Sequence, residues 1–340
     1  MYGQQALLCL AGIPLIQALP PPSAGREKFD LDSTKYMLAF GDSYTYIQGT
    51  HGHQNYSFIG DQLNFAYDAH TLLSNKIVQN QTGTAEGGPN WVEFLTGCGA
   101  NEGLTSPLSC DRQLWDFVYA GADISHTPPP QTIPSLLGHQ IIQYKDYGSS
   151  HPQMHRQTRC KTLVAICIGI NDINDSAKYA VHFPTFYNDL IATLFDSVRQ
   201  LHTLGYRSYL FMNLPPLDRT ERNQQAAVPS PNATQIAWFN AALQQHAHRF
   251  AQSHPRASVM VYDAHAVLAD MMDHPAQYGI VNTTHFCRGY DQPDIAWNYQ
   301  AYGCPTPVDT YFWFNSGHLT SHVHKKLAEA LGETLAGWTG

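Results

Sequence analysis

The most constraining feature of this sequence of 340 residues is an apolar run near its centre. Residues 163–168, which follow Thr162, are apolar at every position. A strand with one face in water alternates apolar and polar residues, so an uninterrupted run is typical of a strand buried on both faces of a parallel sheet. Parallel strands need crossover connections, which are usually helices. The run therefore predicts an α/β fold.

The rest of the chain has the alternation of strands and helices that such a sheet requires. Further strands are predicted near residues 36–40, 115–119, 208–212 and 258–262. Helices are predicted near residues 91–96, 133–147, 186–201, 232–253 and 323–335. This order indicates βαβ units, with helices on both faces of a central parallel sheet. We expect a three-layer α/β/α sandwich that forms one domain over residues 31–340.

The N-terminal end is predicted to be a signal peptide over residues 1–18, followed by a Pro-rich linker over residues 19–30. Residues 6–16 are mostly apolar but too few to span a bilayer, and Ala18 is a small residue suited to a cleavage site. The alternative is a disordered tail, because residues 1–5 contain no Lys or Arg. We expect a secreted protein. Asn-x-Ser/Thr sequons compatible with glycosylation occur at Asn55, Asn80, Asn174, Asn232 and Asn282.

Cysteine usage agrees with secretion. Cys9 would leave with the signal peptide, which leaves six of the seven cysteines. Cys98 with Cys110, and Cys287 with Cys304, would each close a short loop in a turn-rich region, so we predict these two disulfides. The remaining two are Cys160 and Cys167, and the second lies in the apolar run, where it is expected to be a buried thiol.

Charge and composition argue against several classes of partner. The formal net charge is −8, so there is no basic footprint for nucleic acid or for an anionic membrane surface. The sequence has no apolar segment long enough to predict a membrane span. Three histidine pairs have ligand-like spacing, but 18 histidines make such pairs expected by chance, and no cysteine or acidic cluster completes a site. We expect neither a metal nor another cofactor, and a monomer.

Four motifs follow predicted strands or precede the last helix. Ligands of open parallel sheets bind beyond the carboxyl ends of the strands, so these motifs are expected to meet there. A serine can act as a nucleophile, a histidine as its base, and a glycine N–H and an asparagine amide as donors to an oxyanion. The motif residues are Ser43 in Gly41-Asp42-Ser43-Tyr44, Gly121 in Ala120-Gly121-Ala122, Asn171 in Gly169-Ile170-Asn171-Asp172, and His318 in Asn315-Ser316-Gly317-His318. Asp42 and Asp172 are expected to brace these turns.

Together the four motifs resemble those of the GDSL, or SGNH, family of serine hydrolases over about residues 36–338. Residues 90–95, 213–217 and 313–318 are similar to the fungal acetyl esterases of carbohydrate esterase family 16. The resemblance implies a flavodoxin-like SGNH fold and removal of acetyl groups from hemicellulose-derived sugars or oligosaccharides. It also implies that Ser43 is the nucleophile and His318 the base. The oxyanion hole would then consist of the N–H groups of Ser43 and Gly121 and the Asn171 side chain.

The sequence departs from the family pattern at one position. The family usually has Asp three residues before the catalytic His, whereas this chain has Asn315. Three groups could orient the His318 ring: the amide oxygen of Asn315, a backbone carbonyl, or the carboxylate of Asp309.

Two other functions stay open at this point. The first is a lipase or phospholipase, because the family includes both, although no amphipathic lid segment is evident. The second is a catalytically inactive sugar-binding protein, which only Asn315 suggests. Retention of all four motif residues favours the active esterase.

Overall fold

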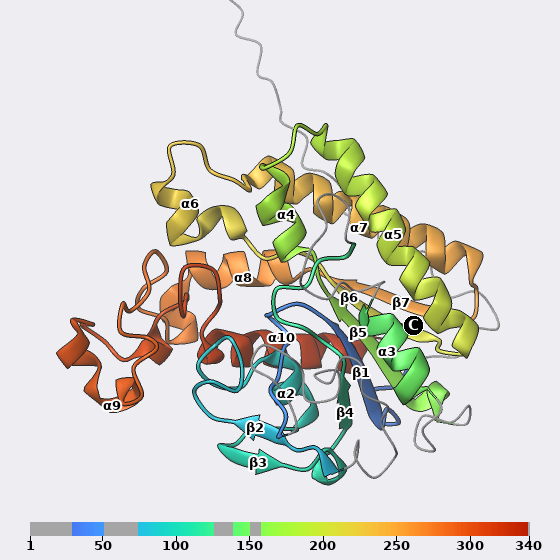
Figure 1. The fold of residues 1–340 in the computed structure, drawn as a ribbon, viewed down its shortest axis with the longest axis horizontal. Helices are drawn as coiled ribbons and strands as arrows, with labels where there is room; N and C mark the ends of the chain where they lie inside the picture. The colour runs from blue at the N-terminus through green and yellow to red at the C-terminus, as the bar shows by residue number, and fades with distance from the viewer. Residues whose placement is uncertain (1–28, 51–73, 126–138, 150–157, 339–340) are drawn as a thin grey trace, which may run out of the picture.

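A five-stranded sheet forms the centre of the protein, with helices on both faces (Figure 1). The computed structural model describes residues 29–50, 74–125, 139–149 and 158–338. The sheet has the order β4-β1-β5-β6-β7, and every neighbouring pair is parallel. Its strands are β1 Tyr36–Gly41, β4 Gln113–Asp116, β5 Thr162–Cys167, β6 Ser208–Met212 and β7 Ser258–Tyr262. The predicted α/β/α architecture is confirmed.

Burial of the strands explains why they form where the sequence indicates. All six residues of β5 are buried, and β5 pairs with β1 on one side and β6 on the other. Burial at this level stabilises a strand by roughly 25 cal/mol for each Å² of apolar surface removed from water. The apolar run therefore takes the central position of the sheet, with β1 beside it.

Helices of the two outer layers come from different parts of the chain (Figure 1). One layer contains α5 (Phe183–Leu204) packed against α7 (Ala233–Ser253), and the other contains α2 (Trp91–Thr96) packed against α10 (Ser321–Gly337). The remaining α-helices of the described residues are α3 Ile141–Gln143, α4 Ile170–Ser176, α6 Glu221–Gln225, α8 Ala264–Asp273 and α9 Ile295–Asn298. A small antiparallel pair is formed by β2 Ile77–Gln79 and β3 Gly103–Thr105.

Capping residues set the starts of two long helices, α7 and α10. The Asn232 side chain accepts the N–H of Gln235 at the start of α7, and the Thr320 hydroxyl accepts the N–H of Val323 at the start of α10. Such a cap satisfies one of the backbone donors that a helix start leaves unpaired, and it is worth about 1 kcal/mol.

Two predicted elements differ from the structure. The strand expected at 115–119 lies at Gln113–Asp116, because the Asp116 carboxylate accepts the N–H of Val118 and the backbone leaves the sheet there. Of the helix expected at 133–147, residues 133–138 lie outside the described residues, and residues 139–148 are helical. The predicted signal peptide also lies outside the described residues, as does the linker except for its last two residues. The single-domain boundary stays a prediction.

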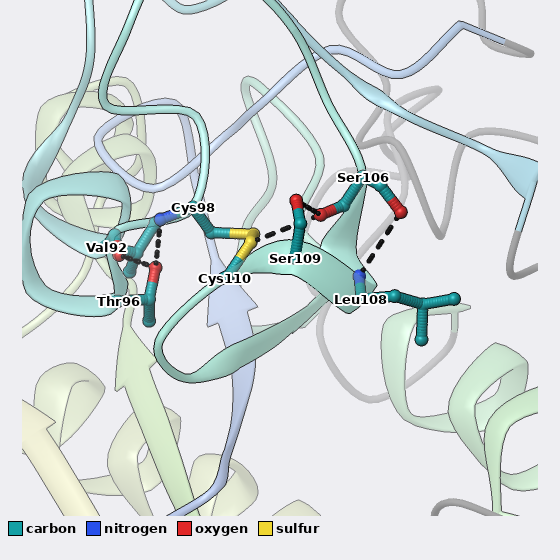
Figure 2. The surroundings of a disulfide bond; sticks show 7 residues. All are labelled: Val92, Thr96, Cys98, Ser106, Leu108, Ser109 and Cys110. Atoms are coloured by element: carbon teal, nitrogen blue, oxygen red, sulfur yellow. Dashed lines mark hydrogen bonds between the residues drawn. A yellow bond between two sulfur atoms is a disulfide. The ribbon is translucent and has the colours of Figure 1, made fainter.

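The two predicted disulfides are present. Cys98 is bonded to Cys110, beside the end of α2 (Figure 2), and Cys287 is bonded to Cys304. Cys287 and Cys304 belong to a small apolar cluster with Ile295 and Tyr311, separate from the main core. Of the cysteines outside the disulfides, Cys167 is buried, as predicted. In the described part of the chain, no helix has the length and apolar character to cross a membrane.

Candidate active site

Ser43 lies in a tight turn directly after β1, at the carboxyl end of the sheet. The turn is held by the buried carboxylate of Asp42, which accepts the N–H of Tyr44 at 3.2 Å and that of Ile170 at 3.4 Å. Gly41 is required here, because a Cβ at that position would lie 2.2 Å from the carbonyl oxygen of Cys167 in β5. Burial raises the pKa of Asp42 to about 7, against the effect of its backbone donors. Asp42 thus joins the nucleophile turn to the start of α4, the bracing role expected of it.

His318 lies in a loop of residues 313–319 just before α10, which we call the His loop. A β-bridge between Trp313 and Leu319 closes the loop, and the N–H of Phe314 donates to the carbonyl of His318 at 2.8 Å. The Tyr44 hydroxyl donates to the Gly317 carbonyl at 2.6 Å. The residue next to Ser43 therefore holds the His loop against the nucleophile turn.

The two ring nitrogens of His318 have different partners. Nε2 lies 2.8 Å from the Ser43 hydroxyl oxygen, and Nδ1 lies 2.9 Å from Oδ1 of Asn315. An amide oxygen only accepts hydrogen bonds, so Nδ1 must carry the ring proton of the neutral imidazole. Nε2 is then the acceptor, and the Ser43 hydroxyl donates to it. This is the arrangement that a general base requires.

Asn315 is placed where a side chain could orient the ring. Its Oδ1 also accepts the backbone N–H groups of Gly317 and His318, each at 3.0 Å, so one oxygen closes the loop and positions Nδ1. Asp309, the alternative, is exposed in the 3-10 turn Val308–Thr310, and the ring nitrogens face Ser43 and Asn315 instead. Among the candidates that the sequence left open, the geometry favours Asn315.

Gly121 and Asn171 lie beside each other at the same edge of the sheet. Gly121 has a positive φ of 81°, a conformation that favours glycine, and the Asn171 amide donates to the carbonyl of Ala122 at 2.9 Å. Asp172 accepts the N–H of Ile124 at 3.1 Å with both carboxylate oxygens, so it braces this loop against α4. Among the described residues no second group accepts from this amide, so its other hydrogen can donate to a substrate oxygen.

A buried pair that sequence reasoning missed lies on the other side of Tyr44. Oε1 of Glu86 lies 3.6 Å from Nε2 of His324, and both side chains are fully buried. The Tyr44 ring is in contact with the rings of both His318 and His324, at centroid distances of 5.6 Å and 5.7 Å. No periodicity or motif marks Glu86, because a single acidic residue in a turn carries no such signal.

Burial leaves this pair uncharged near neutral pH. It raises the pKa of Glu86 to about 8 and lowers the pKa of His324 to about 3. Glu86 is therefore mostly a neutral carboxyl at pH 7 and does not supply the negative charge that the family's Asp would provide. Burial also lowers the pKa of His318, an effect that Glu86 opposes and His324 reinforces. His318 is thus a neutral base at pH 7.

In the part of the chain that the structure describes, no group of three or more His, Cys, Asp or Glu side chains is arranged to hold a metal ion.

Comparison with known proteins identifies the family. The model of the family described as GDSL-like Lipase/Acylhydrolase matches residues 37–331. The chain belongs to this family. It is accordingly a carboxylic ester hydrolase.

Relatives of this acylhydrolase include two fungal enzymes named acetylesterase. The one from Thermothelomyces thermophilus is 22% identical over 310 residues, covering 90% of this chain and 89% of that protein. The one from Hypocrea jecorina is 23% identical over 346 residues, covering 90% of each. A solved structure of the inhibitor-bound M. Smegmatis aryl esterase covers 90% of this chain and 100% of that chain, at 13% identity and a TM-score of 0.38.

Glu86→Gln should change how the stability of this acylhydrolase depends on pH. The pKa of Glu86 is about 8 in the folded protein and 4.5 when unperturbed, so the unfolded state gains more from ionisation as pH rises. The wild type should lose roughly 5 kcal/mol of unfolding free energy from this group between about pH 4.5 and 8. Glu86→Gln removes that loss, so urea denaturation should show the variant gaining stability relative to wild type as pH rises.

Glu329→Gln, an exposed position on α10, is the matched control and should follow the wild type at each pH. A stability difference between Glu86→Gln and wild type that stays constant from pH 4.5 to 8 would contradict the neutral state of Glu86.

Variants of Asn315 should show separately how the orientation of the His318 ring and the charge beside Nδ1 affect activity. Asn315→Asp places a carboxylate beside Nδ1, which favours the imidazolium, so the acid limb of kcat/KM should move to higher pH by about 1–2 units. Asn315→Ala removes the shared acceptor and should lower kcat/KM roughly 10- to 100-fold, about 1.4–2.7 kcal/mol of barrier. pH–rate profiles on p-nitrophenyl acetate measure both effects. Asp309→Ala is the control, and a loss as large as that of Asn315→Ala would make Asp309 the orienting group.

Proposed function

We propose that this acylhydrolase is a secreted acetylesterase that removes acetyl groups from hemicellulose-derived sugars or oligosaccharides by way of an acyl-enzyme on Ser43. The observation that carries the proposal is the 2.8 Å contact between the Ser43 hydroxyl and Nε2 of His318, with Nδ1 held by Asn315. A nucleophile, a base and an orienting group in one hydrogen-bonded line are the arrangement that nucleophilic ester hydrolysis needs.

The reaction has two halves, with proton transfers at Nε2 of His318 throughout. In the first half, the Ser43 oxygen attacks the ester carbonyl while Nε2 takes its proton. The tetrahedral intermediate then collapses, the proton passes to the leaving alcohol oxygen, and the acetyl group stays on Ser43. In the second half, Nε2 takes a proton from water, the hydroxide oxygen attacks the acetyl carbon, and acetic acid leaves as Ser43 recovers its proton.

The oxyanion of each intermediate would accept from the backbone N–H groups of Ser43 and Gly121 and from the Asn171 amide. Backbone N–H groups that donate to the carboxylates of Asp42 and Asp172 brace the turns that carry these donors. Fixed donors stabilise the developing charge without reorganising in the reaction, and each one typically contributes about 10²–10³ in turnover.

The Asn315 amide can replace the usual carboxylate here because the orientation of the amide group is fixed. Exchange of Asp for Asn in another serine hydrolase costs about 10⁴ in turnover, since the ring takes the wrong tautomer. In this protein the N–H groups of Gly317 and His318 both point at Oδ1 of Asn315. They exclude the flipped amide, whose NH₂ group would face two donors. Oδ1 therefore always faces Nδ1 and selects the productive tautomer.

Support for the acetyl group and for the location comes from separate features. The two fungal relatives that match nine-tenths of the chain are named acetylesterase. The resemblance at residues 90–95, 213–217 and 313–318 supports sugar esters as the substrates. The two disulfides support an oxidising compartment, in agreement with the predicted signal peptide.

A substrate panel with Ser43→Ala tests this function. We expect the wild type to hydrolyse p-nitrophenyl acetate faster than the butyrate, and the palmitate least. It should also release acetate from acetylated xylo-oligosaccharides. Ser43→Ala should keep less than about 1% of each activity, because removal of a nucleophile typically costs orders of magnitude in kcat. Circular dichroism controls for folding. Faster turnover of palmitate than acetate would establish a lipase instead, and retained activity in a folded Ser43→Ala would exclude Ser43 as the nucleophile.

A further inference from the structure

A hollow of about 330 Å³ lies beside the His loop, and we call it the α6 pocket. Its volume is at the lower end of the range of ligand sites, roughly 300–1,000 Å³. Ser316, two residues before His318, forms part of its wall, so the pocket and the candidate base share one loop. The lining residues used below are Glu221, Arg222, Gln225, Phe286, Arg288 and Ser316.

The segment that carries Phe286 and Arg288 is fixed in place against the His loop. The Phe286 ring contacts the Tyr290 ring, and Tyr290 contacts Phe314 edge-to-face with centroids 5.0 Å apart. Phe314 directly precedes Asn315. Between Phe286 and Arg288 lies Cys287, which is in a disulfide. The wall of the pocket is therefore built on the same packed unit that positions the candidate catalytic residues.

Arg288 makes two contacts within this wall, while 66% of its side chain is exposed. Its guanidinium donates to Oε1 of Glu221 and lies 4.2 Å from the centroid of the Phe286 ring. The Glu221 side chain is buried, and the same oxygen accepts from Gln225 at 2.9 Å. An arginine fixed by an ion pair and a ring keeps its other N–H donors oriented at low entropic cost. Only one of its terminal nitrogens is used by Glu221.

Arg222 brings a second guanidinium that is not neutralised. It is exposed, and it makes no ion pair or hydrogen bond with another described residue. Glu221 is the one carboxylate among the described residues that line the pocket, and its Oε1 lies against Arg288 and 3.4 Å from Nδ1 of His285. The α6 pocket therefore carries an excess positive charge beside the candidate active site, on a chain whose formal net charge is −8.

We propose that the α6 pocket binds a carboxylate on the sugar portion of the substrate, that of a uronic acid unit near the acetylated residue, through Arg222 and Arg288. The inference rests on the proposed function, since it assumes that the ester alcohol is an oligosaccharide. A guanidinium matches a carboxylate in shape as well as charge, because two parallel N–H groups meet two oxygens. The Ser316 hydroxyl, also in the lining, adds a donor.

The lining also argues against the other ligands of an ester hydrolase. A long acyl chain in this space would remove two guanidinium groups from water without replacing their hydrogen bonds, which is costly. A neutral sugar could accept hydrogen bonds from the guanidinium groups, but it would not use the excess positive charge of Arg222, which is exposed. A carboxylate replaces the hydrogen bonds that the guanidinium groups would lose to water, and its negative charge pairs with their excess positive charge.

The test compares two acetylated xylo-oligosaccharides of equal length, with and without a uronic acid branch, on the full chain. The readout is the ratio of kcat/KM for the acidic substrate to kcat/KM for the neutral one. We expect a ratio of about 10 or more at low salt, from charge-assisted hydrogen bonds to the arginines. The ratio should fall as salt is raised, because Arg222 is exposed and its charge is screened. Arg222→Gln should reduce it to near 1.

Arg219→Gln is the matched control, because Arg219 lies three residues before Arg222, outside the pocket lining, in an ion pair with Asp273. It should leave the ratio at the wild-type value. If both substrates are hydrolysed at equal kcat/KM, or if Arg222→Gln leaves a high ratio unchanged, the inference is overturned while the acetylesterase function stands. Failure to hydrolyse p-nitrophenyl acetate and both oligosaccharides would overturn the proposed function itself, and the inference with it.

Discussion

The hydrogen bond between the Ser43 hydroxyl and Nε2 of His318 joins residues 275 positions apart, and it depends on how the whole fold is assembled. Ser43 is placed by β1, which lies beside the fully buried β5. His318 is placed by the His loop, which directly precedes the first turn of α10. Tyr44 joins the two by donating to Gly317. A shift of the C-terminal segment relative to the sheet would break this contact. The packing of α10 against α2 opposes such a shift.

The charges around His318 differ from those in a serine hydrolase that uses an Asp–His pair. The neutral amide of Asn315 contacts Nδ1 of the His318 ring, and burial keeps Glu86 mostly protonated at pH 7. His324 is neutral as well. A charged acid beside His318 would raise its pKa and favour the imidazolium before the reaction begins. The neutral surroundings keep the base deprotonated to lower pH, at the expense of weaker stabilisation of the imidazolium during the reaction.

Much of this architecture could be predicted from the sequence, and the physical reason is local. β6 and β7 lie where apolar runs placed them, because burial of such a run on two faces leaves little freedom. The strand near Trp115 lies earlier in the chain than the sequence predicts, because a hydrogen bond to the Asp116 side chain ends it. Glu86 and the α6 pocket had no sequence signal, because both depend on contacts between distant segments. The sequence leaves three candidates for the group that orients His318, because the contact between Asn315 and Nδ1 depends on the geometry of the His loop.

The most direct measurement of the central claim is covalent labelling of the active enzyme with a phosphonate ester, followed by peptide mapping by mass spectrometry. A phosphonate reacts with a serine whose hydroxyl is activated by a base and supported by oxyanion donors. We expect one label per chain, on Ser43, with loss of esterase activity in proportion to labelling and no labelling of His318→Ala. A label on another residue, or full activity in a chain labelled at Ser43, would contradict the account.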